Sequence, residues 1–142
     1  MTEKIGQRGK SAEKIVEGVL KSWNTSAGFA YFRLADARAA RNFLAAQPGD
    51  FAYFSGTFAG IIEVKETRHS YRIAKDKISQ LPVLQKLAYA GAKSVILIHH
   101  TTENVWRAVH PLKLSIGQPS WDLSYLPTYA SAEAALKSTG WF

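Results

Sequence analysis

The chain has 142 residues and carries 18 Lys and Arg against 11 Asp and Glu, a formal net charge of +7. This length suffices for one domain with a hydrophobic core, and a hydrophobic content of 46% excludes a wholly disordered tail or linker. The absence of cysteine excludes disulfides, thiolate zinc sites and a cysteine nucleophile.

Neither an export signal nor a membrane span is indicated, because charged residues interrupt the N-terminal segment and apolar runs stay far below about 18 residues. We therefore expect a cytoplasmic protein. The excess of positive charge predicts an anionic partner, most commonly nucleic acid.

The first half of the chain predicts two helices followed by a β-hairpin. Residues 10–23 have the apolar spacing of an amphipathic helix, and a second helix is expected from Asp36 to the break at Pro48. Residues 51–54 and 57–65 then alternate as strands around a turn at Ser55-Gly56. The apolar positions of the first helix are Ala12, Ile15, Val16, Val19, Leu20 and Trp23.

The second half predicts a helix over residues 79–90, strands over 94–98 and 105–109, and a short helix over 131–137. Pro82 is tolerated in the first turn of its helix, where backbone N–H groups lack intrahelical acceptors. This order predicts an α/β fold, a mixed central β-sheet flanked by helices, in a single domain spanning residues 1–142.

The hairpin brings three charged residues to one face of the sheet. With a two-residue turn at Ser55-Gly56, Asp50 faces Ile61, and strand alternation places Glu63 and Lys65 on the same face as Asp50. The opposite face is expected to enter the core and contains Phe51, Tyr53, Phe58, Ile62 and Val64.

Two carboxylates with a neighbouring lysine are typical of a metal-dependent phosphodiester hydrolase. Mg²⁺ prefers carboxylate oxygens and water, which leaves positions for a phosphate oxygen and an attacking water. Lys65 would hold that water or stabilise charge on the phosphate. The competing interpretation is a surface salt bridge between Glu63 and Lys65; the preceding Asp50 favours the metal site.

Basic residues flank this group of charges on both sides in the sequence. Beside a metal site they are interpreted as phosphate contacts, which position DNA without reading its sequence, although such clusters also form ordinary solvated faces. The four histidines lack the spacing of a zinc site and are expected to be structural or exposed. The basic residues are Arg33, Arg38, Arg41, Arg68, Arg72, Lys75 and Lys77.

The arrangement of Asp50 and Glu63-Val64-Lys65 resembles the PD-(D/E)xK nuclease superfamily. Three blocks within about residues 7–100 resemble the RecU-type Holliday junction resolvases of Gram-positive bacteria and phages. These blocks are Arg8-Gly9 with Glu13, then Asp50 with Glu63-Val64-Lys65-Glu66-Thr67, and finally Ser70-Tyr71 leading to Ser79-Gln80.

This resemblance implies a restriction-endonuclease-like core that cuts four-way DNA junctions with paired symmetric nicks, as a homodimer in a bacterial or phage-infected cell. Asp50, Glu63 and the Val64 carbonyl would bind Mg²⁺, with Mn²⁺ able to substitute, and Lys65 would be the catalytic lysine. Glu13 would be an accessory carboxylate and Gln80 would orient the site. Arg8 and Lys10 join the DNA-contacting residues.

The helical spacing places Glu13 at the edge of the apolar stripe and directs Glu17 further into solvent. Two features depart from the family: Ser79 replaces its histidine, and residues 41–49 lack its proline-rich, lysine-bearing stalk. Two alternatives to a resolvase therefore stay open. The first is another metal-dependent endonuclease, nicking or restriction-like, and the second is a non-catalytic DNA-binding module.

Overall fold

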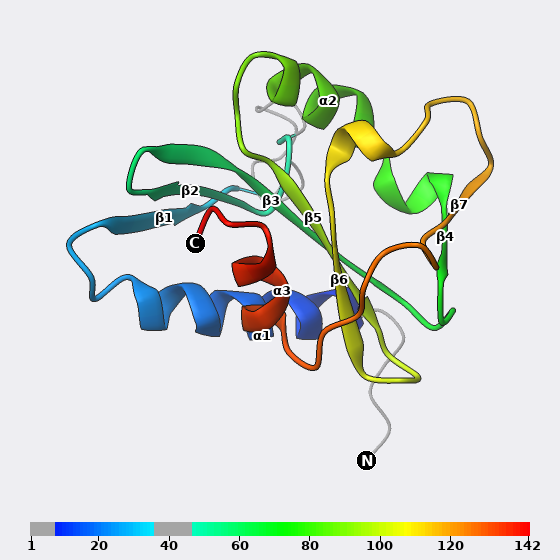
Figure 1. Ribbon diagram of the computed structural model, residues 1–142, viewed down its shortest axis with the longest axis horizontal. Coiled ribbons are helices and arrows are strands. Elements are labelled where there is room, and N and C mark those ends of the chain that lie inside the picture. The colour runs from blue at the N-terminus through cyan, green and yellow to red at the C-terminus, as the bar shows by residue number, and fades with distance from the viewer. Residues whose placement is uncertain (1–7, 36–46) are drawn as a thin grey trace.

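The computed structural model describes residues 8–35 and 47–142 and centres on a five-stranded mixed sheet in the order β1-β2-β3-β5-β6 (Figure 1). The central pair β3–β5 is parallel and the other neighbours are antiparallel. The strands are β1 Phe29–Arg33, β2 Phe51–Ser55, β3 Phe58–Thr67, β5 Val95–His100 and β6 Val105–Val109.

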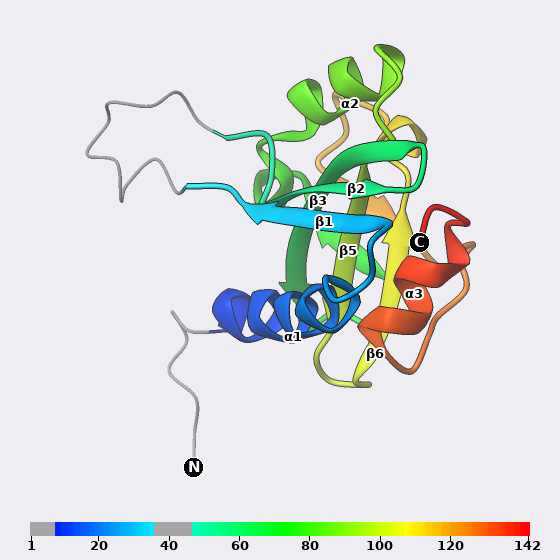
Figure 2. The same ribbon diagram turned by 90° about the vertical axis from the view of Figure 1, so that its left-hand side faces the viewer.

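Helices cover both faces of this sheet, as Figure 2 shows with α1 and α2 on opposite sides. Helices α1 (Arg8–Trp23) and α3 (Ala132–Ser138) enclose one core with β2 and β3. The other core joins α2 (Leu81–Tyr89) to β5 and to a small sheet of β4 (Arg72–Ala74) and β7 (Ser120–Asp122). Short 3₁₀ helices span Lys75–Ile78 and Pro111–Lys113. None of the described helices is long and apolar enough to cross a membrane.

The strand β3 lies between β2 and β5 and is buried on both faces. Ile62 and Val64 pack toward α1 and α3, while the neighbouring strand directs Ile96 and Ile98 toward α2. Glu63 lies level with Ile96 and Lys65 with Ile98, so both charged residues are on the α2 side of the sheet.

The predicted hairpin is confirmed, but its turn was placed one residue too early, which moves the pairing register by two residues. Ser55 pairs with Phe58, so the turn residues are Gly56 and Thr57, and Gly56 adopts φ +59°, a conformation that favours glycine. A shift of two residues leaves every side chain on its predicted face, because side chains alternate with a period of two. Asp50 precedes β2 and was expected to face Ile61, but Ile61 pairs with Ala52, and the backbone N–H of Asp50 donates to the Ile62 carbonyl.

Most other predicted elements are confirmed, with differences at exposed or non-local positions. Strand β1 and the β4–β7 pair were not predicted, and the expected helix from Asp36 lies largely outside the described residues. Ile15 and Phe58 were expected on buried faces but are 46% and 36% exposed, since neither is covered by a packed element.

Candidate active site

Asp50 is fixed at the junction of three strands. Its backbone N–H donates to the Ile62 carbonyl (3.0 Å), and its own carbonyl accepts from the Leu34 N–H (2.9 Å). One carboxylate oxygen, Oδ2, accepts a hydrogen bond of 2.7 Å from the Val64 N–H. The carboxylate thus lies directly beside the Glu63-Val64-Lys65 segment of β3.

Glu63 is a buried acid with an unused oxygen. The residue is only 1% exposed, and its Oε2 has no hydrogen-bond partner among the described residues. Its Oε1 lies 3.7 Å from the Lys65 Nζ, and the Lys65 side chain keeps 23% exposure. Burial, and then the neighbouring Asp50, raise the pKa of Glu63 to about 9.

Helix α1 supplies a third carboxylate. Burial and the proximity of Asp50 raise the pKa of Glu13 to about 7, against the opposing effect of Arg33. Glu17, expected to point further into solvent, instead forms an ion pair of 2.9 Å with Arg33, and its side chain is as covered as that of Glu13, at 20% against 23% exposure. The reason is that β1, which carries Arg33, packs beside α1.

These residues fit a divalent cation. Among the described residues the Oε2 of Glu63 lacks a partner, and the neighbouring carboxylates repel one another when ionised. A cation bound by these oxygen ligands would satisfy the first and offset the second. The Val64 carbonyl points to the same side of β3 as its N–H, which Asp50 binds. Within the described residues, no group of three or more acidic or histidine side chains is placed to bind one metal ion, so main-chain, water or phosphate oxygens would have to complete the coordination.

The remaining predicted site residues do not all converge here. Gln80 precedes α2, where its Oε1 accepts from the Ser79 hydroxyl (3.3 Å), and no hydrogen bond or ion pair links it to Glu63 or Lys65 among the described residues. Arg33 binds Glu13 and Glu17. The side chains of Arg8 and Lys10 are not described, and Arg38 and Arg41 lie outside the described residues.

The segment after β3 carries exposed cations. Arg68 and Lys75 are exposed, and Arg72 lies 3.7 Å from Asp122 and donates to Ser120 (3.0 Å). Lys77 donates to the carbonyl of Glu66 (3.4 Å), next to the end of the strand that bears Glu63.

A buried arginine, which the sequence analysis missed, anchors this segment. Arg107 donates to the carbonyl of Ser70 (2.7 Å) and lies 2.9 Å from His100, whose Nδ1 is 2.6 Å from the carbonyl of His69. Burial lowers the pKa of His100, which favours the neutral ring that accepts from Arg107. The sequence feature that could have revealed this role is the position of Arg107 inside an otherwise apolar predicted strand, residues 105–109.

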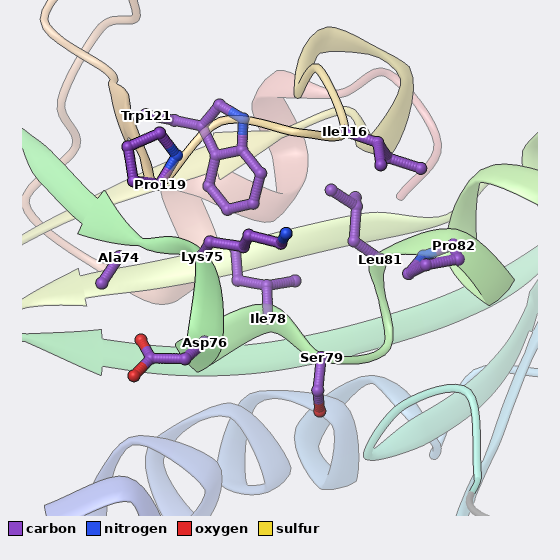
Figure 3. A pocket seen from close by; sticks show the side chains of 10 residues that line it. All are labelled: Ala74, Lys75, Asp76, Ile78, Ser79, Leu81, Pro82, Ile116, Pro119 and Trp121. Carbon is purple, nitrogen blue, oxygen red and sulfur yellow. The ribbon is translucent and has the colours of Figure 1, made fainter.

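A separate apolar cavity of about 580 Å³ lies beside the 3₁₀ helix Lys75–Ile78 and the start of α2 (Figure 3). Ile78, Leu81 and Trp121 contribute to its walls. Asp50, Glu63 and Lys65 are not among its lining residues, so the carboxylate site is distinct from this cavity.

Comparison with known proteins identifies the class of fold. No family model matches the sequence, and no curated protein matches it. Among solved structures, the chain is similar in fold to a Holliday junction resolvase. That protein is Hjc from the archaeal hyperthermophile Archaeoglobus fulgidus, with a TM-score of 0.57, 19% sequence identity and coverage of 95% of this chain and 98% of that chain. The predicted mixed sheet flanked by helices is thereby confirmed as a fold of this class.

Proposed function

We propose that this protein is a metal-dependent DNA endonuclease that resolves four-way junctions by paired symmetric nicks. The observation that carries the proposal is the buried Glu63, with an unpartnered Oε2, beside Asp50 and Lys65. The fold shared with Hjc, and the sequence blocks resembling RecU-type resolvases, support the junction as substrate.

Asp50, Glu63 and the Val64 carbonyl would hold Mg²⁺, or Mn²⁺ in its place. When bound, the ion supplies a Lewis acid at the scissile phosphate and lowers the pKa of a coordinated water. Lys65 places its ammonium group beside this position, where it stabilises negative charge developing on the phosphate. Glu13 adds a carboxylate next to Asp50, on the side of α1.

Exposed cations after β3 would contact phosphates on the arms of the junction. A four-way junction requires two symmetric cuts, so we propose a two-fold homodimer that presents two sites. The RecU-like blocks also support bacterial or phage origin.

The test compares cutting of a labelled four-way junction and a linear duplex in Mg²⁺. We expect the wild-type protein to give paired symmetric nicks on the junction. Glu63→Gln and Lys65→Met should reduce the cutting rate by about 100-fold or more, because each removes an electrostatic contribution to the transition state. Junction binding, measured in Ca²⁺ or EDTA, should change by less than about twofold, because phosphate contacts elsewhere supply affinity.

Glu103→Gln is the matched control, because Glu103 is exposed in the β5–β6 loop, and it should cut like the wild-type protein. Equal cutting of duplex and junction by the wild-type protein would replace the resolvase with a general or restriction-like nuclease. Binding without cutting in Mg²⁺ and Mn²⁺ would indicate a non-catalytic DNA-binding module.

A further inference from the structure

Arg33 occupies a position that joins α1 to the carboxylate site. It is the last residue of β1 and pairs in the sheet with Phe51, which directly follows Asp50. Its Nη2 lies 3.1 Å from Glu13 Oε2 and its Nη1 lies 2.9 Å from Glu17 Oε1. The guanidinium also lies over the ring of Phe51, 5.8 Å from the ring centroid.

In this geometry the Arg33 guanidinium is bound by carboxylates of the protein itself. Glu13 and Glu17 are one helical turn apart, so the planar guanidinium bridges two carboxylates on one side of α1, and each carboxylate takes a different nitrogen. Although its side chain is 52% exposed, both terminal nitrogens of Arg33 already bind anions. A phosphate would therefore have to compete with two carboxylates for this group.

We propose that Arg33 is a positioning residue, which holds Glu13 against Asp50, rather than a contact to DNA phosphate. This inference rests on the proposed function, because it assigns Glu13 a part in phosphodiester cleavage. Without the guanidinium, the carboxylate of Glu13 would face that of Asp50 without its main counter-charge and would turn toward solvent. A lysine would retain the charge but not the two-nitrogen geometry.

The first test separates cutting from binding. Arg33→Met should lower the single-turnover cutting rate at saturating protein by about 10- to 100-fold, the effect of displacing a group in a catalytic site. Junction affinity and its salt dependence should be unchanged within about twofold, and Arg33→Lys should restore part of the rate.

The matched control is Lys137→Met. Lys137 is also exposed, at 59%, and pairs with an acid, Glu133, at 3.6 Å, but it lies in α3 and belongs neither to the carboxylate site nor to the proposed DNA contacts. It should change neither the cutting rate nor junction binding. If Arg33→Met instead weakens junction binding and its salt dependence without changing the cutting rate at saturation, Arg33 is a phosphate contact and the proposal is wrong.

A double-mutant cycle tests the route of the effect. In a Glu13→Gln background, Arg33→Met should cause no further loss of cutting, since its partner is already neutral; additive losses would overturn the proposal. Urea unfolding of the same variants measures the coupling between Arg33 and Glu13 independently of activity. If the two substitutions have additive effects on the free energy of unfolding, the Arg33–Glu13 contact is rejected, even when the protein is an active nuclease. If the effects are non-additive but the protein cuts no DNA, the contact stands and the proposed function is rejected instead.

Discussion

At the residue scale, Glu63 combines features that a structural residue rarely has. A carboxylate in the middle of a sheet is costly unless it is paired, protonated or bound to a metal. Lys65 approaches one oxygen at 3.7 Å and leaves the other without a partner among the described residues. Burial of this incompletely paired carboxylate therefore destabilises the metal-free protein at the position where the proposed metal binds.

This cost predicts a specific dependence of stability on pH. The pKa of Glu63 is about 9 in the folded protein against 4.5 for the ordinary side chain, so the folded state binds more protons between these values. Without divalent metal, the free energy of unfolding should therefore be greatest near pH 5 and fall as the pH rises toward 9. The slope from one such group is at most about 1.4 kcal/mol per pH unit.

Urea unfolding in EDTA at pH 5.5, 7 and 8.5, followed by tryptophan fluorescence, measures this dependence. Glu63→Gln should flatten it, leaving the smaller contribution of Glu13, whose pKa is raised in the same direction. Mg²⁺ should stabilise the wild-type protein most at high pH. A wild-type slope equal to that of Glu63→Gln would contradict the assigned environment of Glu63.

At the scale of elements, the β2–β3 hairpin sets the register between Asp50 and Glu63, and Gly60 is essential to how it packs. Gly60 pairs with Tyr53, and a Cβ at this position would overlap the backbone of Lys93. That backbone is held in place, because its N–H donates to Ala59 (2.8 Å) and its carbonyl accepts from the Tyr53 hydroxyl (2.6 Å).

Gly60→Ala should consequently destabilise the protein by about 1–3 kcal/mol, the usual cost of overpacking a rigid site. Gly18→Ala is the matched control, since a Cβ there meets open space on α1 and should stabilise the helix by up to about 1 kcal/mol. Urea unfolding of both variants measures the difference. Equal stability of Gly60→Ala and the wild-type protein would show that the Lys93 backbone can move.

At the scale of the whole molecule, the net charge of +7 contrasts with the acidic site. We expect Arg68→Gln and Lys75→Gln each to reduce the slope of log affinity against log salt by about 0.9 if each cation contacts one phosphate. Fluorescence anisotropy with a labelled junction at several salt concentrations measures this slope.

Lys137→Gln is the control for this experiment. Lys137 lines a hollow with Gly28 and Ser55, at the opposite end of β2 from Asp50, and the slope should be unchanged. An equal effect of all three substitutions would indicate diffuse attraction rather than phosphate contacts beside the site.

The features that depend on short-range periodicity could be predicted from the residue pattern alone. The apolar spacing of α1, the hairpin and its two faces, the β5 and β6 strands and the short α3 helix were all predicted, because each pattern lies within a few turns or strand repeats. Alternation along the hairpin also placed Asp50, Glu63 and Lys65 on one face. Placing the turn one residue too early did no harm, because it shifts the pairing register by two residues and so preserves the period of two.

The distant segments that cover the site could not be predicted in this way, because they are brought together by long-range packing. Strand β1 pairs with β2 across the segment between residues 33 and 51, and β4 pairs with β7 across residues 74–120, pairings that no local pattern specifies. The same packing brings Arg33 to Glu13 and buries Glu63 between β2 and β5. Periodicity indicates which face of an element is buried, whereas the desolvation and ion pairing that define this site depend on the elements that pack against that face.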